Sequence, residues 1–198
     1  MSVKFPLGIL ITVSFLFSCS SKHEKENNRG SVEKRSILAE VKSPLDDFIE
    51  LEQKLRKDSL NIELRTLLAS NYYVSKELDK AAYHFLIIYE LDHKNLAALS
   101  NLGNIYYDSQ EDDKAIEFYE KSLEIDSKNV NLRCDLAVCY SRINRLKKAI
   151  QILKENIKID ERHEKSHYNL SVLQKLEGNF EESDQEMKIY NTLISSSK

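Results

Sequence analysis

The residues His163-Glu164-Lys165-Ser166-His167 form a pattern that could support chemistry. Two His side chains four residues apart on a helix can hold Zn²⁺, while the Glu between them acts as a general base. A zinc site also needs a third protein ligand, and no His follows His167, so Glu177, Glu181 or Glu182 would have to supply it. A zinc-dependent hydrolase is therefore one hypothesis for this chain.

The cysteines and the rest of the sequence offer little other reactive chemistry. The chain has 3 cysteines, too few for a disulfide framework. Cys134 and Cys139 lie five residues apart on one predicted helix, so their side chains diverge by about 140° and no disulfide is expected between them. No Gly-rich phosphate loop and no Ser/His/Asp set stands out. We therefore expect no cofactor, and the favoured prediction is a protein without enzymatic activity.

The composition indicates an all-α protein. The 198 residues include 4 Gly and 2 Pro, fewer than strand-and-turn architectures need to reverse the chain. Charged residues make up 31% and hydrophobic residues 41%, a balance typical of amphipathic helices. Lys and Arg number 29 against 32 Asp and Glu, so no basic surface is expected to bind nucleic acid.

The first 19 residues differ from the rest of the chain. Lys4 is the only charged residue before residue 22, and residues 5–17 are almost wholly apolar. A membrane-spanning helix needs roughly 20 apolar residues, so this shorter run is typical of a signal peptide. It ends in Leu16-Phe17-Ser18-Cys19, which resembles the processing box of bacterial lipoproteins. An ordinary secretory signal with a chance Cys is the alternative.

The lipoprotein resemblance implies that the protein is located in the bacterial cell envelope. Residues 1–18 would be removed, and Cys19 would carry acyl chains such as palmitate that attach the chain to a membrane. Ser20 and Ser21 follow the Cys where an Asp would favour inner-membrane retention, so we expect the outer membrane, on its periplasmic or surface face. Residues 19–43 are predicted to be a flexible tether, since residues 20–31 contain no aliphatic or aromatic side chain to bury. Whether residues 32–41 form a short helix stays open.

The rest of the chain repeats with a period of 34 residues. Three series recur in register: Leu68, Leu102, Leu136 and Leu170; the small residues Ala69, Gly103, Ala137 and Ser171; and the large residues Phe85, Tyr119, Leu153 and Met187. Within each unit the spacings are those of two helical faces, and small residues let the two helices approach closely. A single hairpin cannot bury its apolar face but stacked hairpins can, so the sequence predicts an all-α, helical-hairpin repeat solenoid.

This pattern resembles the tetratricopeptide repeat (TPR) family over about residues 45–195. We predict an unpaired N-terminal helix in residues 44–61, followed by repeat units at 62–95, 96–129, 130–163 and 164–198, the last one divergent. The apolar position early in the first helix of each unit holds Arg65, Leu99, Arg133 and His167. The repeat thus gives His167 a packing role and puts His163 in a turn, which makes the zinc hydrolase the minor hypothesis.

The TPR resemblance also implies a binding surface. In TPR arrays the first helices line a concave groove, and the matching positions here are Tyr73, Asn101, Asn104, Tyr107, Asn131, Asp135, Arg142, Lys165, Tyr168 and Asn169. Asn side chains can pair with an extended peptide backbone, and Tyr rings can anchor apolar groups. The carboxylate clamp of chaperone-binding TPR domains is not expected, because Asp135 would repel a carboxylate.

The sequence therefore predicts a non-enzymatic, lipid-anchored scaffold or adaptor that binds a partner protein or peptide. An accessory role in outer-membrane assembly, pilus assembly or cell-wall enzyme control fits this prediction, and the sequence does not choose among the three. The alternative within the binding class is a homo-oligomeric structural lipoprotein of the envelope, joined through the apolar end around Ile189 and Leu193.

Overall fold

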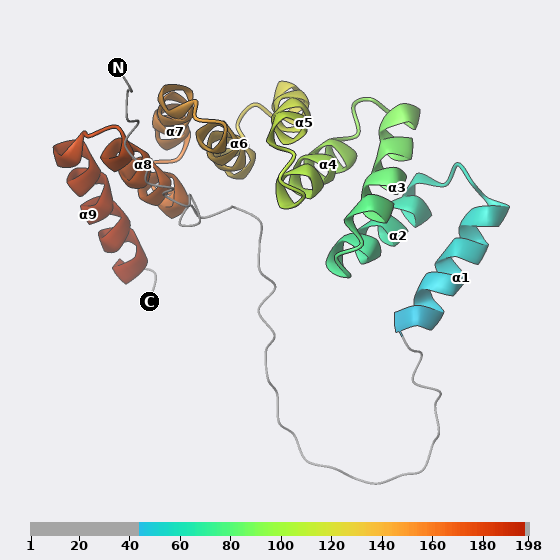
Figure 1. The fold of residues 1–198 in the computed structure, drawn as a ribbon. Helices are drawn as coiled ribbons and strands as arrows, with labels where there is room; N and C mark the ends of the chain where they lie inside the picture. Colours follow the sequence, from blue (N-terminus) through green and yellow to red (C-terminus); the bar gives the residue numbers. More distant parts are fainter. Residues whose placement is uncertain (1–43, 197–198) are drawn as a thin grey trace, which may run out of the picture. The chain divides into compact units, whose positions relative to one another are not determined.

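The computed structural model describes residues 44–196 of the chain. All regular structure in this part is α-helical (Figure 1). The helices are α1 Pro44–Lys57, α2 Ile62–Val74, α3 Leu78–Leu91, α4 Leu96–Asp108, α5 Asp112–Ile125, α6 Val130–Arg142, α7 Leu146–Ile159, α8 Glu164–Leu176 and α9 Phe180–Ser196. The signal peptide 1–18, Cys19, the tether 19–43 and the open question of a helix over 32–41 lie outside the described residues.

Asn caps set the start of the first helix in three of the predicted units. The side chains of Asn61, Asn95 and Asn129 accept hydrogen bonds from the backbone N–H groups three residues further on, at 2.9, 3.0 and 3.1 Å. Such a cap satisfies an N–H group that has no partner within the helix and stabilises the helix by about 1 kcal/mol. His163 occupies the same place before α8 but makes no side-chain cap bond to the helix backbone.

The turn inside each hairpin uses the left-handed backbone region. Lys76, Gln110, Asn144 and Gly178 have φ values of 64°, 62°, 60° and 85°, and they are spaced by the repeat period. In each turn the residue that follows donates its N–H back to the last helical turn, as Glu77 does to the Tyr72 carbonyl at 2.9 Å. This is the Schellman arrangement that ends helices. Gly adopts it at no steric cost, so Lys76 and Gln110 hold a backbone that an L side chain disfavours.

The described helices divide into two compact units, and the division falls inside α6, between Leu132 and Arg133. The N-terminal unit has α1 to α5. Its core is a continuous apolar cluster that includes Leu51, Leu68, Phe85 and Leu102. α1 covers α2 from outside the first hairpin, and α3 packs against α4.

The small and large residues of the repeat meet inside the hairpins. In the N-terminal unit, Gly103 of α4 lies directly against the ring of Tyr119 of α5, so a Cβ atom at position 103 would come within 2.5 Å of the ring. The ring is 1% exposed, and its hydroxyl donates to the Asn104 side chain at 2.8 Å. Gly103 is therefore required by close approach rather than by backbone conformation.

The C-terminal unit has the rest of α6 with α7, α8 and α9. α8 packs along both α7 and α9, and it buries Leu170 and Leu173 together with Ser171. The outer helix α9 keeps apolar side chains at its surface, since Phe180 is 64% and Ile189 41% exposed. Among residues 44–196, no helix is both long enough and apolar enough to cross a bilayer.

Candidate functional site

Four of the predicted groove residues lie on α2 and α4 of the N-terminal unit. Tyr73, Asn101, Asn104 and Tyr107 are all half-buried. The hydroxyl of Tyr73 donates to Asp108 at 3.1 Å, which joins the ends of α2 and α4. The side-chain amide of Asn101 donates to the Ala97 carbonyl one turn earlier, at 2.8 Å. These side chains form a partly accessible polar face, which we call the α2–α4 face.

The corresponding residues of α6 and α8 are placed differently. Asn169 is fully buried, and its side-chain amide lies 3.2 Å from the Cys134 sulfur. Asp135 is 4% exposed. The remaining predicted groove residues are either half-buried, namely Arg142, Lys165 and Tyr168, or exposed, namely Asn131. Asn101 and Asn169 hold the same place in the repeat, yet Asn169 is a packing contact between α6 and α8.

The two His residues of the zinc motif make structural hydrogen bonds. His163 precedes α8, and its Nδ1 lies 2.7 Å from the Ser166 hydroxyl. His167 is buried, with Nδ1 2.6 Å from the Glu186 carboxylate and Nε2 3.0 Å from the Glu161 carbonyl. A zinc ligand needs a ring nitrogen with a free lone pair, and both nitrogens of His167 already face acceptors. Residues 44–196 bring together no group of three or more His, Cys, Asp or Glu suited to a metal ion.

The environment of His167 favours its charged form. Burial lowers the pKa of the imidazole, but the hydrogen bonds to Glu186 and to the Glu161 carbonyl, with the negative charge of Glu186, outweigh burial and raise it above 6.5. This buried ion pair holds α9 against α8. His167 therefore fills the packing position that the repeat assigns to it.

The position that holds His167 in the last hairpin holds Arg65 and Arg133 in the first and third. At this position the basic side chains contact the second helix of their own hairpin. Arg133 lies 3.5 Å from the Glu155 carboxylate, and His167 pairs with Glu186. Arg65 instead places Nη1 3.2 Å from Nδ1 of His84, a residue at the same repeat position as Glu186. The sequence marks Arg65 as a departure from an apolar pattern but does not reveal this partner.

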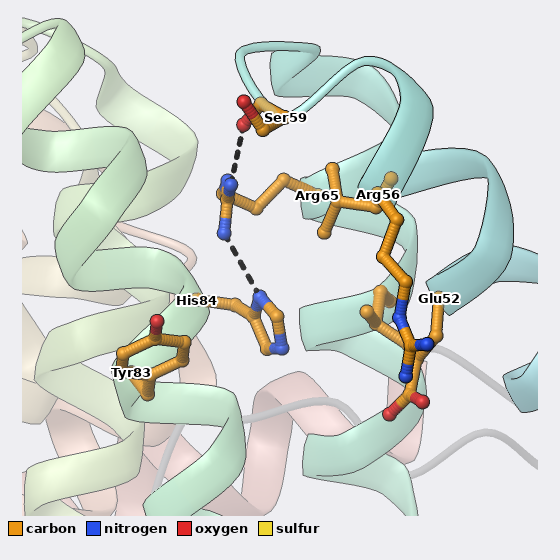
Figure 2. Close-up of a pocket in the computed structure, with 8 residues that line it drawn as sticks. Glu52, Arg56, Ser59, Arg65, Tyr83 and His84 are labelled. Atoms are coloured by element: carbon orange, nitrogen blue, oxygen red, sulfur yellow. Dashed lines mark hydrogen bonds between the residues drawn. The ribbon is translucent and has the colours of Figure 1, made fainter.

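A pocket of about 470 Å³ lies beside Arg65, between α1, α2 and α3 (Figure 2). Its lining residues are Glu52, Leu55, Arg56, Ser59, Arg65, Leu68, Tyr83 and His84. In Figure 2 the Arg65 guanidinium bridges the Ser59 carbonyl and the His84 ring, while Glu52 and Arg56 extend from the α1 wall. The pocket is not evident from the sequence, because three separate elements contribute to it.

Burial and the neighbouring charges together favour the neutral form of His84. Burial and the adjacent Arg65 charge lower the pKa of His84 below 6.5, and Glu52 offsets only part of this effect. His84 is therefore neutral at pH 7, so its Nδ1 accepts a hydrogen bond from Arg65. Glu52 accepts a hydrogen bond from the Tyr72 hydroxyl at 2.6 Å, and burial together with this bond raises the pKa of Tyr72 to about 12.

Comparison with known proteins identifies the fold. Residues 95–162 match the sequence model of a family described as "Tetratricopeptide repeat". Among solved structures, "Crystal structure of MamA" aligns with a TM-score of 0.74 at 16% identity, covering 78% of this chain and 90% of that one. "MamA 41-end from Desulfovibrio magneticus RS-1" aligns with a TM-score of 0.73 at 14% identity, covering 77% of this chain and 86% of that one.

A third structure, "MamA MSR-1 C2", aligns with a TM-score of 0.69 at 22% identity, over 78% of this chain and 89% of that one. No curated protein matches the sequence. At these identities the structural likeness shows the fold alone. It confirms the predicted all-α fold built of repeated helical hairpins.

Proposed function

Because residues 95–162 match the tetratricopeptide repeat model, we propose that this chain is a non-catalytic scaffold that binds a partner protein or peptide and that a lipid on Cys19 anchors it in the bacterial cell envelope. The repeat fold supports the binding role, since such hairpin arrays present extended surfaces to partners. The Leu16-Phe17-Ser18-Cys19 segment supports the anchor. We place the protein at the outer membrane, in an accessory role in outer-membrane assembly, pilus assembly or cell-wall enzyme control.

The accessibility of the α2–α4 face is the observation that carries the binding proposal. The Asn101 amide group donates to the Ala97 carbonyl, and within the described residues its side-chain oxygen accepts no hydrogen bond. That oxygen can accept an N–H of an extended peptide. The half-buried rings of Tyr73 and Tyr107 offer flat apolar surface to the side chains of the same peptide.

Crosslinking in living cells tests this proposal. A photoreactive benzoylphenylalanine at position 101 of the full chain is expected to capture a partner, because it would lie in the bound peptide's path. The matched control places the same residue at Glu124, an exposed position on α5. No adduct at position 101, or the same adducts at both positions, would contradict recognition by the α2–α4 face.

The lipid anchor has its own test, independent of the partner. Cells that express the full chain are grown with a palmitate analogue. Labelling of the protein and its partitioning into detergent are then measured. Cys19→Ala is expected to abolish both, whereas Cys134→Ala removes a buried thiol from α6 and should leave them unchanged. Labelling that survives Cys19→Ala would exclude Cys19 as the anchor.

A second candidate, self-association, is favoured by the exposed apolar side chains of α9. Ile189, which is 41% exposed, and the half-buried Leu193 lie one helical turn apart on α9, and neighbouring accessible apolar side chains can mark contacts with other chains. Sedimentation of the full chain in detergent at micromolar concentration tests it. A dimer that Ile189→Glu converts to monomer would support self-association, and a wild-type monomer would exclude it.

A further inference from the structure

Arg65 is a buried cation whose protein partners are all uncharged. The side chain is 6% exposed, and burying a charge without a counter-charge is costly. Its Nη2 donates to the Ser59 carbonyl and its Nη1 to the neutral His84 ring. Its Nε is buried with no acceptor in the described part of the chain. The guanidinium has five N–H donors, of which these two bonds use two, and no carboxylate of the described residues forms an ion pair with it.

Two other hairpins show the kind of partner that Arg65 lacks, a carboxylate. At the same repeat position, Arg133 faces the Glu155 carboxylate at 3.5 Å, and His167 faces the Glu186 carboxylate at 2.6 Å. His84 stands in the first hairpin where Glu186 stands in the last. A carboxylate therefore pairs with the basic residue at this position in the third and fourth hairpins, whereas Arg65 in the first hairpin has no such ion pair.

The pocket beside Arg65 has room for such a group. Its volume of about 470 Å³ lies in the range of small-ligand sites, and both Arg65 and Arg56 line it. Glu52 also lines the pocket, but its carboxylate is hydrogen-bonded to Tyr72 on the α1 side. The Tyr83 ring, which is 61% exposed, flanks the opening and could pack against the stem of an incoming side chain.

We propose that this pocket binds a carboxylate presented by a partner peptide, with Arg65 as its principal donor and Arg56 as a second cation. The planar guanidinium fork matches a carboxylate, and a charge-assisted bond in a buried place is stronger than one at the surface. Two Arg side chains and one Glu line the pocket, so a singly charged carboxylate balances their net positive charge better than a doubly charged phosphate does. This site shares no residue with the α2–α4 face and would give the scaffold a separate contact with its partner.

The His84 ring reports directly on occupancy. An anion next to Arg65 would offset the charge that disfavours protonation of His84, so binding should raise the pH at which the ring titrates. The test follows the His84 ring signals by NMR in the full chain. The probes are acetyl-Gly-Glu-Gly-amide, its Gln analogue, succinate and inorganic phosphate.

The expected result is a saturable shift of the His84 signals with the Glu peptide and none with the Gln peptide. Arg65→Leu should weaken binding at least tenfold, and it should fold because Leu99 fills the same position in the second hairpin. Arg56→Ala, at an exposed site on α1, should weaken binding a few-fold without a packing change. Arg133→Leu is the matched control and should bind as the natural chain does.

Four outcomes would overturn the proposal. The first is no saturable shift with the Glu peptide, and the second is a shift that persists in a folded Arg65→Leu variant. The third is tighter binding of phosphate than of the Glu peptide, which would exclude the carboxylate assignment. The fourth is tighter binding of succinate than of the Glu peptide, which would exclude a peptide as the source of the carboxylate.

Discussion

The close approach of Gly103 and Tyr119 makes a quantitative prediction about the second hairpin. An added Cβ at position 103 would lie 2.5 Å from both Cδ1 and Cε1 of the ring. Carbon atoms in contact prefer about 3.5–4.0 Å, so the ring would have to withdraw by about 1 Å. The ring is buried, and its hydroxyl is held by Asn104 at 2.8 Å, so both ends resist this movement.

Two opposing contributions determine the effect of Gly103→Ala on the free energy of unfolding. Ala is the better helix former by about 1 kcal/mol, which favours the variant. Overpacking a well-filled core costs about 1–3 kcal/mol, and a clash with a ring held at both ends belongs at the upper end of that range. We therefore expect Gly103→Ala to destabilise the chain by about 1–2 kcal/mol in urea unfolding.

A double-mutant cycle separates the clash from other effects. The second background is Tyr119→Leu, in which Gly103→Ala reproduces the Ala137 and Leu153 pair of the next repeat, where both residues are fully buried. In that background Gly103→Ala should be neutral or stabilising by up to about 1 kcal/mol, since only the helix-propensity gain remains. Equal destabilisation in both backgrounds, or a stable single variant, would refute the proposed contact.

Three other predictions concern charge, backbone and packing. Glu186→Gln should destabilise the chain by about 1–2 kcal/mol at pH 5.5 and by less at pH 9, as measured by urea unfolding at both pH values. The reason is that the raised pKa of His167 adds stability below pH 6.5, and this stability is lost as the pH rises through the folded-state pKa. Gln110→Gly should raise the unfolding free energy by about 1 kcal/mol by relieving a φ of 62°, and a lower melting temperature would contradict it. Arg65→Leu combined with His84→Phe should be neutral or stabilising by about 1–4 kcal/mol, since apolar residues replace a buried charge; a loss in urea unfolding would show that the charge is already compensated.

The repeat made the fold predictable from the sequence. A match between small residues such as Gly103 and large ones such as Tyr119, recurring every 34 residues, is the signature of two closely packed helices. It depends on side-chain volume and helical spacing, both of which can be read from the sequence. The positions of the hairpin turns were harder to infer, because Lys76 and Gln110 adopt a conformation that their residue types do not suggest.

The accessibility of individual polar residues was not predictable in this way. Asn101 and Asn169 share a repeat position, but Asn169 is buried against Cys134 while Asn101 is partly exposed. The difference depends on which side chain of a neighbouring helix lies opposite, and the period does not specify it. The Arg65 pocket is not evident from the sequence for a related reason, since α1, α2 and α3 each contribute part of it.

The left-handed turn residues also affect the order in which the hairpins unfold. In hairpin arrays, stability is close to a sum of local terms and contacts between neighbours. Within the N-terminal unit, Lys76 weakens the α2–α3 hairpin and Gln110 weakens the α4–α5 hairpin, each through one exposed residue. A Gly at position 110 would strengthen the α4–α5 hairpin without altering a helix face. A Gly at position 76 would also remove the bond from Lys76 to Asp108 and the contact of Lys76 with the Tyr73 ring of the α2–α4 face. The turn at Gln110 therefore offers a means of setting which hairpin opens first, independently of the α2–α4 face.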